Sequence, residues 1–217
     1  MNSYDYSKLK GTHATFGGSN YAWLGYDDEK IIQAYYARRA KDLGTALHEY
    51  ARQRISNSLK MTKGDSYAVV NHILESKLPR GIIQYAGGID SIMATLIPYV
   101  NDGIKYRMRP EALTYFADEF YGWADALSFN ERNKTLRIHD FKSGKLIASM
   151  TQLKIYSAFY CLGTGLKPEN INIELRIYQN GEVVVDNPEA EEIQEIMDKS
   201  EHDNAVLMHH LKEGEPL

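Results

Sequence analysis

Two carboxylates and a lysine, Asp125, Asp140 and Lys142, have the types and spacing for hydrolytic chemistry beside a bound cation. Asp140 and Lys142 end the run TLRIHDFK, which has the composition of a strand. Successive strand side chains alternate between faces, so Leu136, Ile138, Asp140 and Lys142 share one face. Leu136 and Ile138 require a core, whereas charges in the same row are costly unless they are paired, hydrated or bound. The sequence therefore predicts that the sheet opens onto a ligand at Asp140.

A hairpin would bring the second carboxylate to the first. Gly122–Phe129 and Thr135–Lys142 are predicted strands around the polar turn NERNK. A turn centred on Arg132-Asn133 makes Asp125 face Asp140, at about 5 Å, where like charges destabilise a sheet. Such a pair also raises one carboxyl pKa. A divalent cation removes this difficulty, and Mg²⁺ is usually held by one or two carboxylates, water and substrate phosphate.

Lys142 lies two residues beyond Asp140 on the same predicted face. Beside a metal and a phosphate, such a lysine can position or deprotonate an attacking water, or neutralise charge in the transition state. The alternative is an ordinary surface pair between Asp140 and Lys142, worth ~0–1 kcal/mol.

Two helical pairs add to this set. Gln152 and Tyr156 are four residues apart, so they share a helix face, which we expect to point toward the Asp140 strand. The alternative is a core tyrosine and a glutamine bonded to backbone. His48 follows Gly44 by four residues, and we expect the glycine to clear space beside the imidazole. A lone helical histidine is more often structural, but beside a metal site it is a further ligand.

The elements that must position these residues are predicted as a mixed α/β domain with a central mixed sheet flanked by helices. One domain is expected over residues 1–217, with an irregular N-terminal segment over 1–28 and an acidic helix and tail over 187–217. The remaining predicted helices are Glu29–Ser58, Ser66–Glu75, Ile89–Gly103 with a break or kink at Pro98, and Met150–Leu162. Strand character begins near Ala112, returns at Asn172–Gln179 and Glu182–Asp186, and Pro188 opens a helix predicted to end near Asp203.

Composition limits the class of protein. The net charge of −4 is unevenly distributed along the chain. Ten acidic and two basic residues lie from Asp186 onward, and the preceding part is mildly basic. This basic part is compatible with phosphate binding. The single cysteine, Cys161, excludes an internal disulfide and any site built from several thiolates. No apolar run is long enough for a membrane span or a secretory signal, so we expect a cytoplasmic protein.

Together these residues resemble the PD-(D/E)xK nuclease superfamily, and within it the RecB-like exonucleases and their phage relatives. The family pattern is a helix with G-x-x-x-H, a strand with G-x-x-D, a strand with D-x-K and a helix with Q-x-x-x-Y. This chain carries the pattern in the same order and spacing, as Gly44 and His48, Gly122 and Asp125, Asp140 and Lys142, and Gln152 and Tyr156.

The resemblance implies a restriction-endonuclease-like core and a site that binds Mg²⁺ or Mn²⁺. The implied metal ligands are His48, Asp125, Asp140 and the backbone carbonyl of Phe141, with Lys142 as catalytic base or water-positioning group and Gln152 and Tyr156 in support. Glu119 is a candidate for an additional acid. The four cysteines that hold an iron–sulfur cluster in some relatives are absent, so no cluster is expected.

The function implied is metal-dependent DNA exonuclease activity, of the phage type used in recombination or DNA processing, in the host cytoplasm if the chain is phage-encoded. An endonuclease with the same site is the second reading. A protein on the nuclease fold that binds nucleic acid or a partner without cutting is a third, and a structural cation site a fourth. The expected partner is DNA, with a single-strand-binding or annealing protein and a homo-oligomer as further candidates.

Overall fold

The computed structural model describes residues 6–11, 14–144 and 149–213. It contains six α-helices in this part of the chain: α1 (Asp28–Ser56), α2 (Ser66–Glu75), α3 (Gly81–Tyr85), α4 (Ile89–Lys105), α5 (Thr151–Thr164) and α6 (Ala190–Glu213). The strands are β1 (Arg109–Ala117), β2 (Phe120–Asn130), β3 (Thr135–Lys142), β4 (Asn172–Gln179) and β5 (Glu182–Asp186). Short 3₁₀ helices cover Tyr6–Leu9, Tyr21–Gly25, Lys63–Asp65 and Pro168–Asn170.

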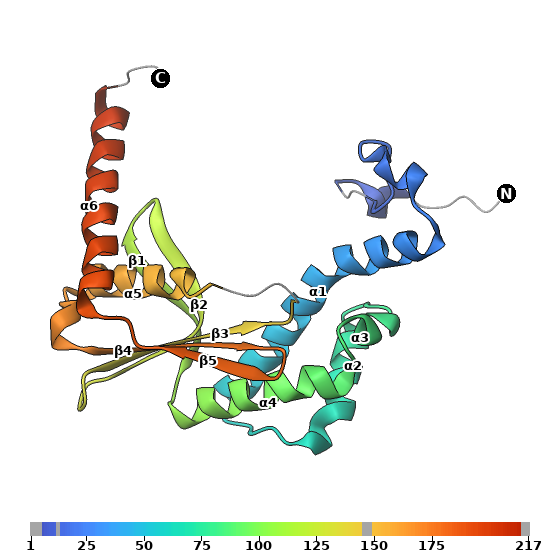
Figure 1. Cartoon of the computed structure of the whole chain (residues 1–217), viewed down its shortest axis with the longest axis horizontal. Coiled ribbons are helices and arrows are strands. Elements are labelled where there is room, and N and C mark those ends of the chain that lie inside the picture. Colours follow the sequence, from blue (N-terminus) through green and yellow to red (C-terminus); the bar gives the residue numbers. More distant parts are fainter. Residues whose placement is uncertain (1–5, 12–13, 145–148, 214–217) are drawn as a thin grey trace.

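The five strands form one mixed sheet in the order β1-β2-β3-β4-β5. Only the β3–β4 pairing is parallel among these strands, and the chain makes this crossover through α5, as parallel neighbours require. Helices α1 to α4 lie on one side of the sheet, and α5 and α6 on the other (Figure 1). The predicted fold class, a mixed sheet flanked by helices, is confirmed.

Each face of the sheet has its own hydrophobic core. Leu136 and Ile138 of β3 are buried in the cluster that contains Leu153 of α5. Phe141 of β3 is buried in the opposite cluster, with Leu47 of α1. The predicted alternation of the β3 side chains is therefore correct, and it fixes the direction in which the strand presents Asp140.

The β2–β3 hairpin has the predicted register. Its ladder runs from Ala126 opposite His139 to Asn130 opposite Thr135, around a turn centred on Arg132-Asn133. The described ladder ends at Ala126, one residue after Asp125. There Asp125 Oδ2 accepts a hydrogen bond of 2.9 Å from the Phe141 backbone N–H. A side-chain carboxylate thus takes a position that a carbonyl would hold in a regular ladder.

Several element boundaries differ from the predictions. Helix α4 continues through Pro98 to Lys105, so of the predicted break or kink at Pro98 the break is wrong. Helix α6 continues to Glu213 rather than ending near Asp203, because Ala205–Leu211 contains good helix formers. Residues 1–5, 12–13 and 214–217 of the predicted terminal segments lie outside the described part. No helix within the described part is long and apolar enough to cross a membrane.

Candidate active site

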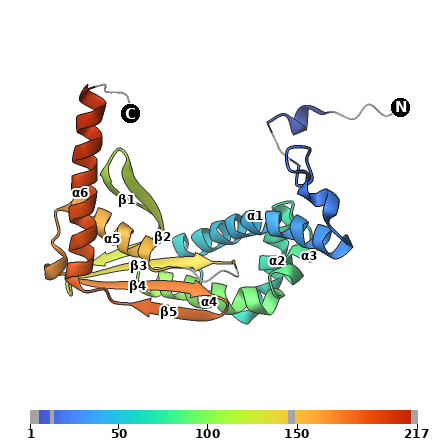
Figure 2. The same cartoon turned by 45° about the horizontal axis from the view of Figure 1, so that its top comes forward.

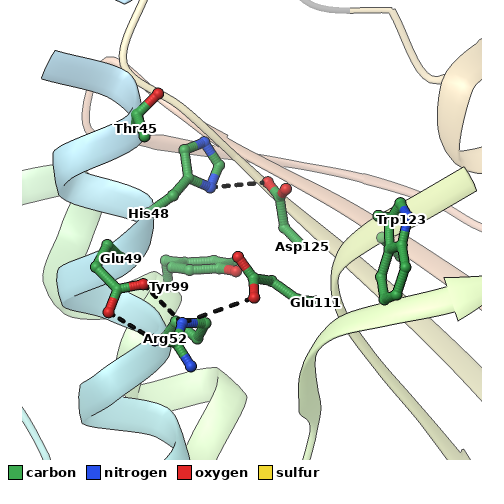
Figure 3. Close-up of a pocket in the computed structure, with 9 residues that line it drawn as sticks. Thr45, His48, Glu49, Arg52, Tyr99, Glu111, Trp123 and Asp125 are labelled. Atoms are coloured by element: carbon green, nitrogen blue, oxygen red, sulfur yellow. Dashed lines mark hydrogen bonds and ion pairs between the residues drawn. The ribbon is translucent and has the colours of Figure 1, made fainter. Parts of the chain in front are cut away.

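Helix α1 reaches the sheet through His48. Its Nδ1 lies 3.4 Å from Asp125 Oδ2, as Figure 3 shows. The imidazole also packs edge-on against the Phe141 ring, with the ring centroids 5.3 Å apart. Burial lowers the pKa of His48, which keeps the imidazole neutral and able to bind a metal at neutral pH. The structure therefore brings His48 and Asp125 together, as the sequence predicted.

Gly44 has a different role from the one predicted. A β-carbon at this position would lie 3.1 Å from Ser143 Oγ. Apart from the backbone of α1 and the chain neighbours of Gly44, no other atom of the described structure would lie within 4 Å of it. The space left by Gly44 is thus taken up by Ser143, just beyond β3, and not by the imidazole of His48. The glycine allows α1 to approach the end of the strand that carries Asp140.

Asp140 is almost fully buried, with 3% of its surface exposed. Its Oδ1 lies 3.0 Å from Lys142 Nζ, whereas its Oδ2 is buried with no hydrogen-bond partner. The pKa of both Asp125 and Asp140 is raised to about 6, mainly by burial, and for Asp140 the neighbouring Asp125 charge is the second cause. An unpaired buried carboxylate oxygen is costly in free energy, and Lys142 contacts only Oδ1 of Asp140.

Lys142 connects β3 to α5. Its Nζ donates a hydrogen bond of 3.4 Å to Gln152 Oε1, and Gln152 Nε2 donates one of 2.7 Å to the Tyr156 hydroxyl. The tyrosine ring fills the space beside Gly122, where a β-carbon would overlap its Cε1. The predicted orientation of Gln152 and Tyr156 toward the Asp140 strand is present in the structure.

A pocket of about 280 Å³ lies between α1 and the β1–β2 hairpin, against this cluster (Figure 3). It is lined by Thr45, His48, Glu49, Arg52, Tyr99, Glu111, Trp123, Ala124 and Asp125. The pocket thus exposes Asp125 and His48 on the side from which a substrate could approach.

Glu111, and not Glu119, lines this pocket together with the acids Glu49 and Asp125. Glu111 adopts a left-handed backbone conformation within β1, with φ of 47°, and its Oε2 lies 3.7 Å from Arg52 Nε. Arg52 is also held by Glu49 through hydrogen bonds of 2.7 and 2.6 Å. Glu119 lies between β1 and β2 and does not line the pocket, so the structure does not bring it to Asp125.

The residues present fit a hard divalent cation held by few protein side chains. In the described residues no group of three or more His, Cys, Asp or Glu side chains is arranged to hold a metal. The unpartnered Oδ2 of Asp140 and the neutral imidazole of His48 are nevertheless suitable donors. Mg²⁺ commonly takes one or two carboxylates and completes its shell with water and substrate oxygens.

The mixed sheet thus brings two carboxylates, Asp125 and Asp140, and Lys142 close together. The chain matches the family model of the PD-(D/E)XK nuclease superfamily over residues 13–214, and it therefore belongs to that superfamily. The predicted resemblance is confirmed at this level. No curated protein and no solved structure gives a significant match. Membership implies a nuclease with a DNA substrate, in a superfamily that generally uses divalent metals such as Mg²⁺.

Proposed function

We propose that this protein is a DNA exonuclease that depends on Mg²⁺ or Mn²⁺ and uses the site between α1, β2, β3 and α5. The observation that carries the proposal is the buried Oδ2 of Asp140, which has no partner although Asp125 and Lys142 lie beside it. A structural ion pair between Asp140 and Lys142 alone would leave this oxygen uncompensated.

In this proposal His48, Asp125 and Asp140 hold the metal, with the Phe141 carbonyl as a fourth protein ligand. A bound divalent ion supplies Lewis-acid stabilisation of the charge that develops on the phosphoryl group and lowers the pKa of water. Burial favours the neutral form of both carboxyls, so binding a cation would favour their ionised form.

Lys142 has the role of base or water-positioning group. Its Nζ is tethered by Asp140 on one side and by Gln152 on the other, at 3.0 and 3.4 Å. An ammonium or amine held in this way can orient the water that attacks phosphorus, while the bond from phosphorus to the leaving oxygen breaks. Gln152 and Tyr156 act through Lys142 and are therefore positioning residues.

Exonuclease rather than endonuclease activity is proposed because the four motifs resemble those of RecB-like and phage exonucleases. Single strands produced in this way would pass to a single-strand-binding or annealing protein. An oligomer that encloses the DNA would favour cutting from ends.

The test is digestion of end-labelled linear DNA and of closed circular DNA with Mg²⁺, with Mn²⁺ and with chelator. Wild type is compared with Lys142→Ala and with Lys167→Ala, which removes a lysine that is 72% exposed and lies outside these motifs. Metal-dependent loss of linear DNA alone, abolished only in Lys142→Ala, is expected. Cutting of circles would replace the proposal by an endonuclease, and no cutting by folded protein would favour a binding protein.

A further inference from the structure

The β1–β2 hairpin presents large apolar side chains to solvent on one face. Leu113, Tyr115, Tyr121 and Trp123 are 40%, 45%, 53% and 56% exposed, respectively. In Figures 1 and 2 the hairpin projects from the sheet on the side where α6 lies. Exposed aromatic residues gathered on one strand pair are a feature of binding surfaces.

The four side chains form two cross-strand pairs in register. Leu113 is opposite Trp123, and Tyr115 is opposite Tyr121, whose ring lies 6.4 Å from that of Tyr115 at an interplanar angle of 29°. The other face of the hairpin is packed on the core that includes α5, where Ala112 is 1% exposed. One face of the hairpin is therefore packed against the core. The other face, which carries the aromatic side chains, is exposed to solvent in the described structure.

The platform is continuous with the candidate active site. Trp123 lines the same pocket as Asp125 and stands two residues before it on β2. Two strand residues span about 7 Å, so the Leu113–Trp123 and Tyr115–Tyr121 pairs follow one another away from Asp125 at intervals of roughly two stacked bases.

The charges of the hairpin indicate which part of a nucleic acid it could contact. No lysine or arginine occurs from Pro110 to Trp123, whereas Asp118 and Glu119 lie in its turn. Phosphate groups are not attracted to such a surface. Aromatic rings, in contrast, stack on the faces of bases without regard to sequence.

We propose that the hairpin is a stacking platform for unpaired bases of single-stranded DNA adjoining the scissile phosphate. This inference rests on the proposed function and adds the form of the substrate near the site. The strand enters the pocket with its bases against Trp123 and the Tyr115–Tyr121 pair. The acidic turn limits the platform to these two pairs.

The test measures binding of single-stranded oligothymidylate, in chelator so that no cutting occurs. Wild type is compared with Trp123→Ala, Trp123→Phe and Tyr121→Ala, and with Tyr67→Ala as a control for loss of an aromatic side chain that is 76% exposed on α2. Stacking predicts about a 5- to 150-fold loss of affinity for each hairpin alanine variant and near wild-type affinity for Trp123→Phe. The slope of log affinity against log salt concentration should not change, since no phosphate contact is removed.

Fluorescence gives an independent measurement. The chain has two tryptophans, so Trp23→Phe leaves Trp123 as the sole indole. Its emission should be quenched by oligothymidylate and much less by a duplex of the same length. Circular dichroism and sedimentation of each variant report folding and mass.

The inference is overturned if the hairpin alanine variants bind oligothymidylate like wild type or lose no more affinity than Tyr67→Ala. It is also overturned if they change the mass of the protein and not its DNA affinity, because the hairpin would then be a surface for self-association. A wild type that cuts DNA while these variants bind normally refutes the platform alone. A wild type that binds oligothymidylate but cuts no DNA refutes the proposed nuclease activity alone.

Discussion

Gly122 of β2 and Tyr156 of α5 are in such close contact that a β-carbon at position 122 would overlap Cε1 of the tyrosine ring. The tyrosine of the Q-x-x-x-Y motif therefore fills the space that a side chain would take at the glycine of the G-x-x-D motif. Tyr156 accepts a hydrogen bond from Gln152, which in turn accepts one from Lys142. The absence of a side chain at Gly122 thus makes room for Tyr156, which helps to position Lys142 through Gln152.

Gly122→Ala is expected to destabilise the protein by about 1–3 kcal/mol, because an added methyl group must displace a packed ring. Urea unfolding measures this. In a Tyr156→Ala background the same substitution should cost less than about 0.5 kcal/mol, since the ring is absent. Gly25→Ala, where a β-carbon meets no atom within 4 Å, is the matched control. Equal costs in the two backgrounds would show that the ring is not the cause.

Gln152→Ala is expected to lower kcat by about tenfold with little change in KM, because Gln152 holds Lys142 without facing the pocket. Tyr156→Phe should have a smaller effect in the same direction, since it removes only the hydroxyl that Gln152 contacts. The double variant should lower kcat no more than Gln152→Ala alone. Additive losses would indicate that they act on separate steps.

The contribution of Asp125 and Asp140 to the stability of the metal-free protein should fall as the pH rises from about 4 to about 6. Burial raises the pKa of Asp125 and Asp140 to about 6, whereas an unfolded aspartate titrates near 3.9. The folded state therefore binds more protons in this interval, and the free energy of unfolding decreases with pH, by about 2–5 kcal/mol for the pair. Urea unfolding in chelator at a series of pH values tests this.

Asp140→Asn supplies the comparison for that titration. The variant should show a shallower dependence on pH and should exceed wild type in stability above pH 6 when no metal is present. Parallel pH dependences of wild type and Asp140→Asn in chelator would contradict the assigned burial of the carboxylates. Mg²⁺ should restore the stability of wild type at pH 7 and have little effect on Asp140→Asn.

His48→Ala is expected to raise the Mg²⁺ concentration for half-maximal activity by at least about tenfold, as loss of a metal-binding contact does. Glu119→Gln should leave this concentration within twofold of wild type, because Glu119 lies between β1 and β2 and away from the pocket. Activity measured over a range of Mg²⁺ concentrations distinguishes them. A stronger effect of Glu119→Gln than of His48→Ala would require a different site.

Local patterns were sufficient to predict the register of the hairpin that carries Asp125 and Asp140. The turn NERNK fixes the β2–β3 register, and the period of two along β3 fixes the face on which Asp140 and Lys142 lie. The spacing of Gln152 and Tyr156 on one helix face is equally local. These features depend on residues within a few positions of one another.

Features that depend on contacts between distant segments could not be predicted in this way. Glu111 enters the pocket through a left-handed conformation in the middle of a strand, which its sequence does not indicate. The partner of Gly44 is Ser143, about a hundred residues away in the chain. The Asp118–Glu119 turn of the β1–β2 hairpin is preceded by a register shift between Tyr115 and Ala117, which the sequence does not indicate.

The assembly of the site from α1, β2, β3 and α5 has a consequence for the nascent chain. The β3–β4 pairing that encloses α5 joins residues as far apart as Arg137 and Glu174, 37 positions along the chain. Loop closure of this kind is costly and tends to form late in folding. A nascent chain in which β4 has not yet been made therefore lacks the strand that pairs with β3 along Asp140 and Lys142.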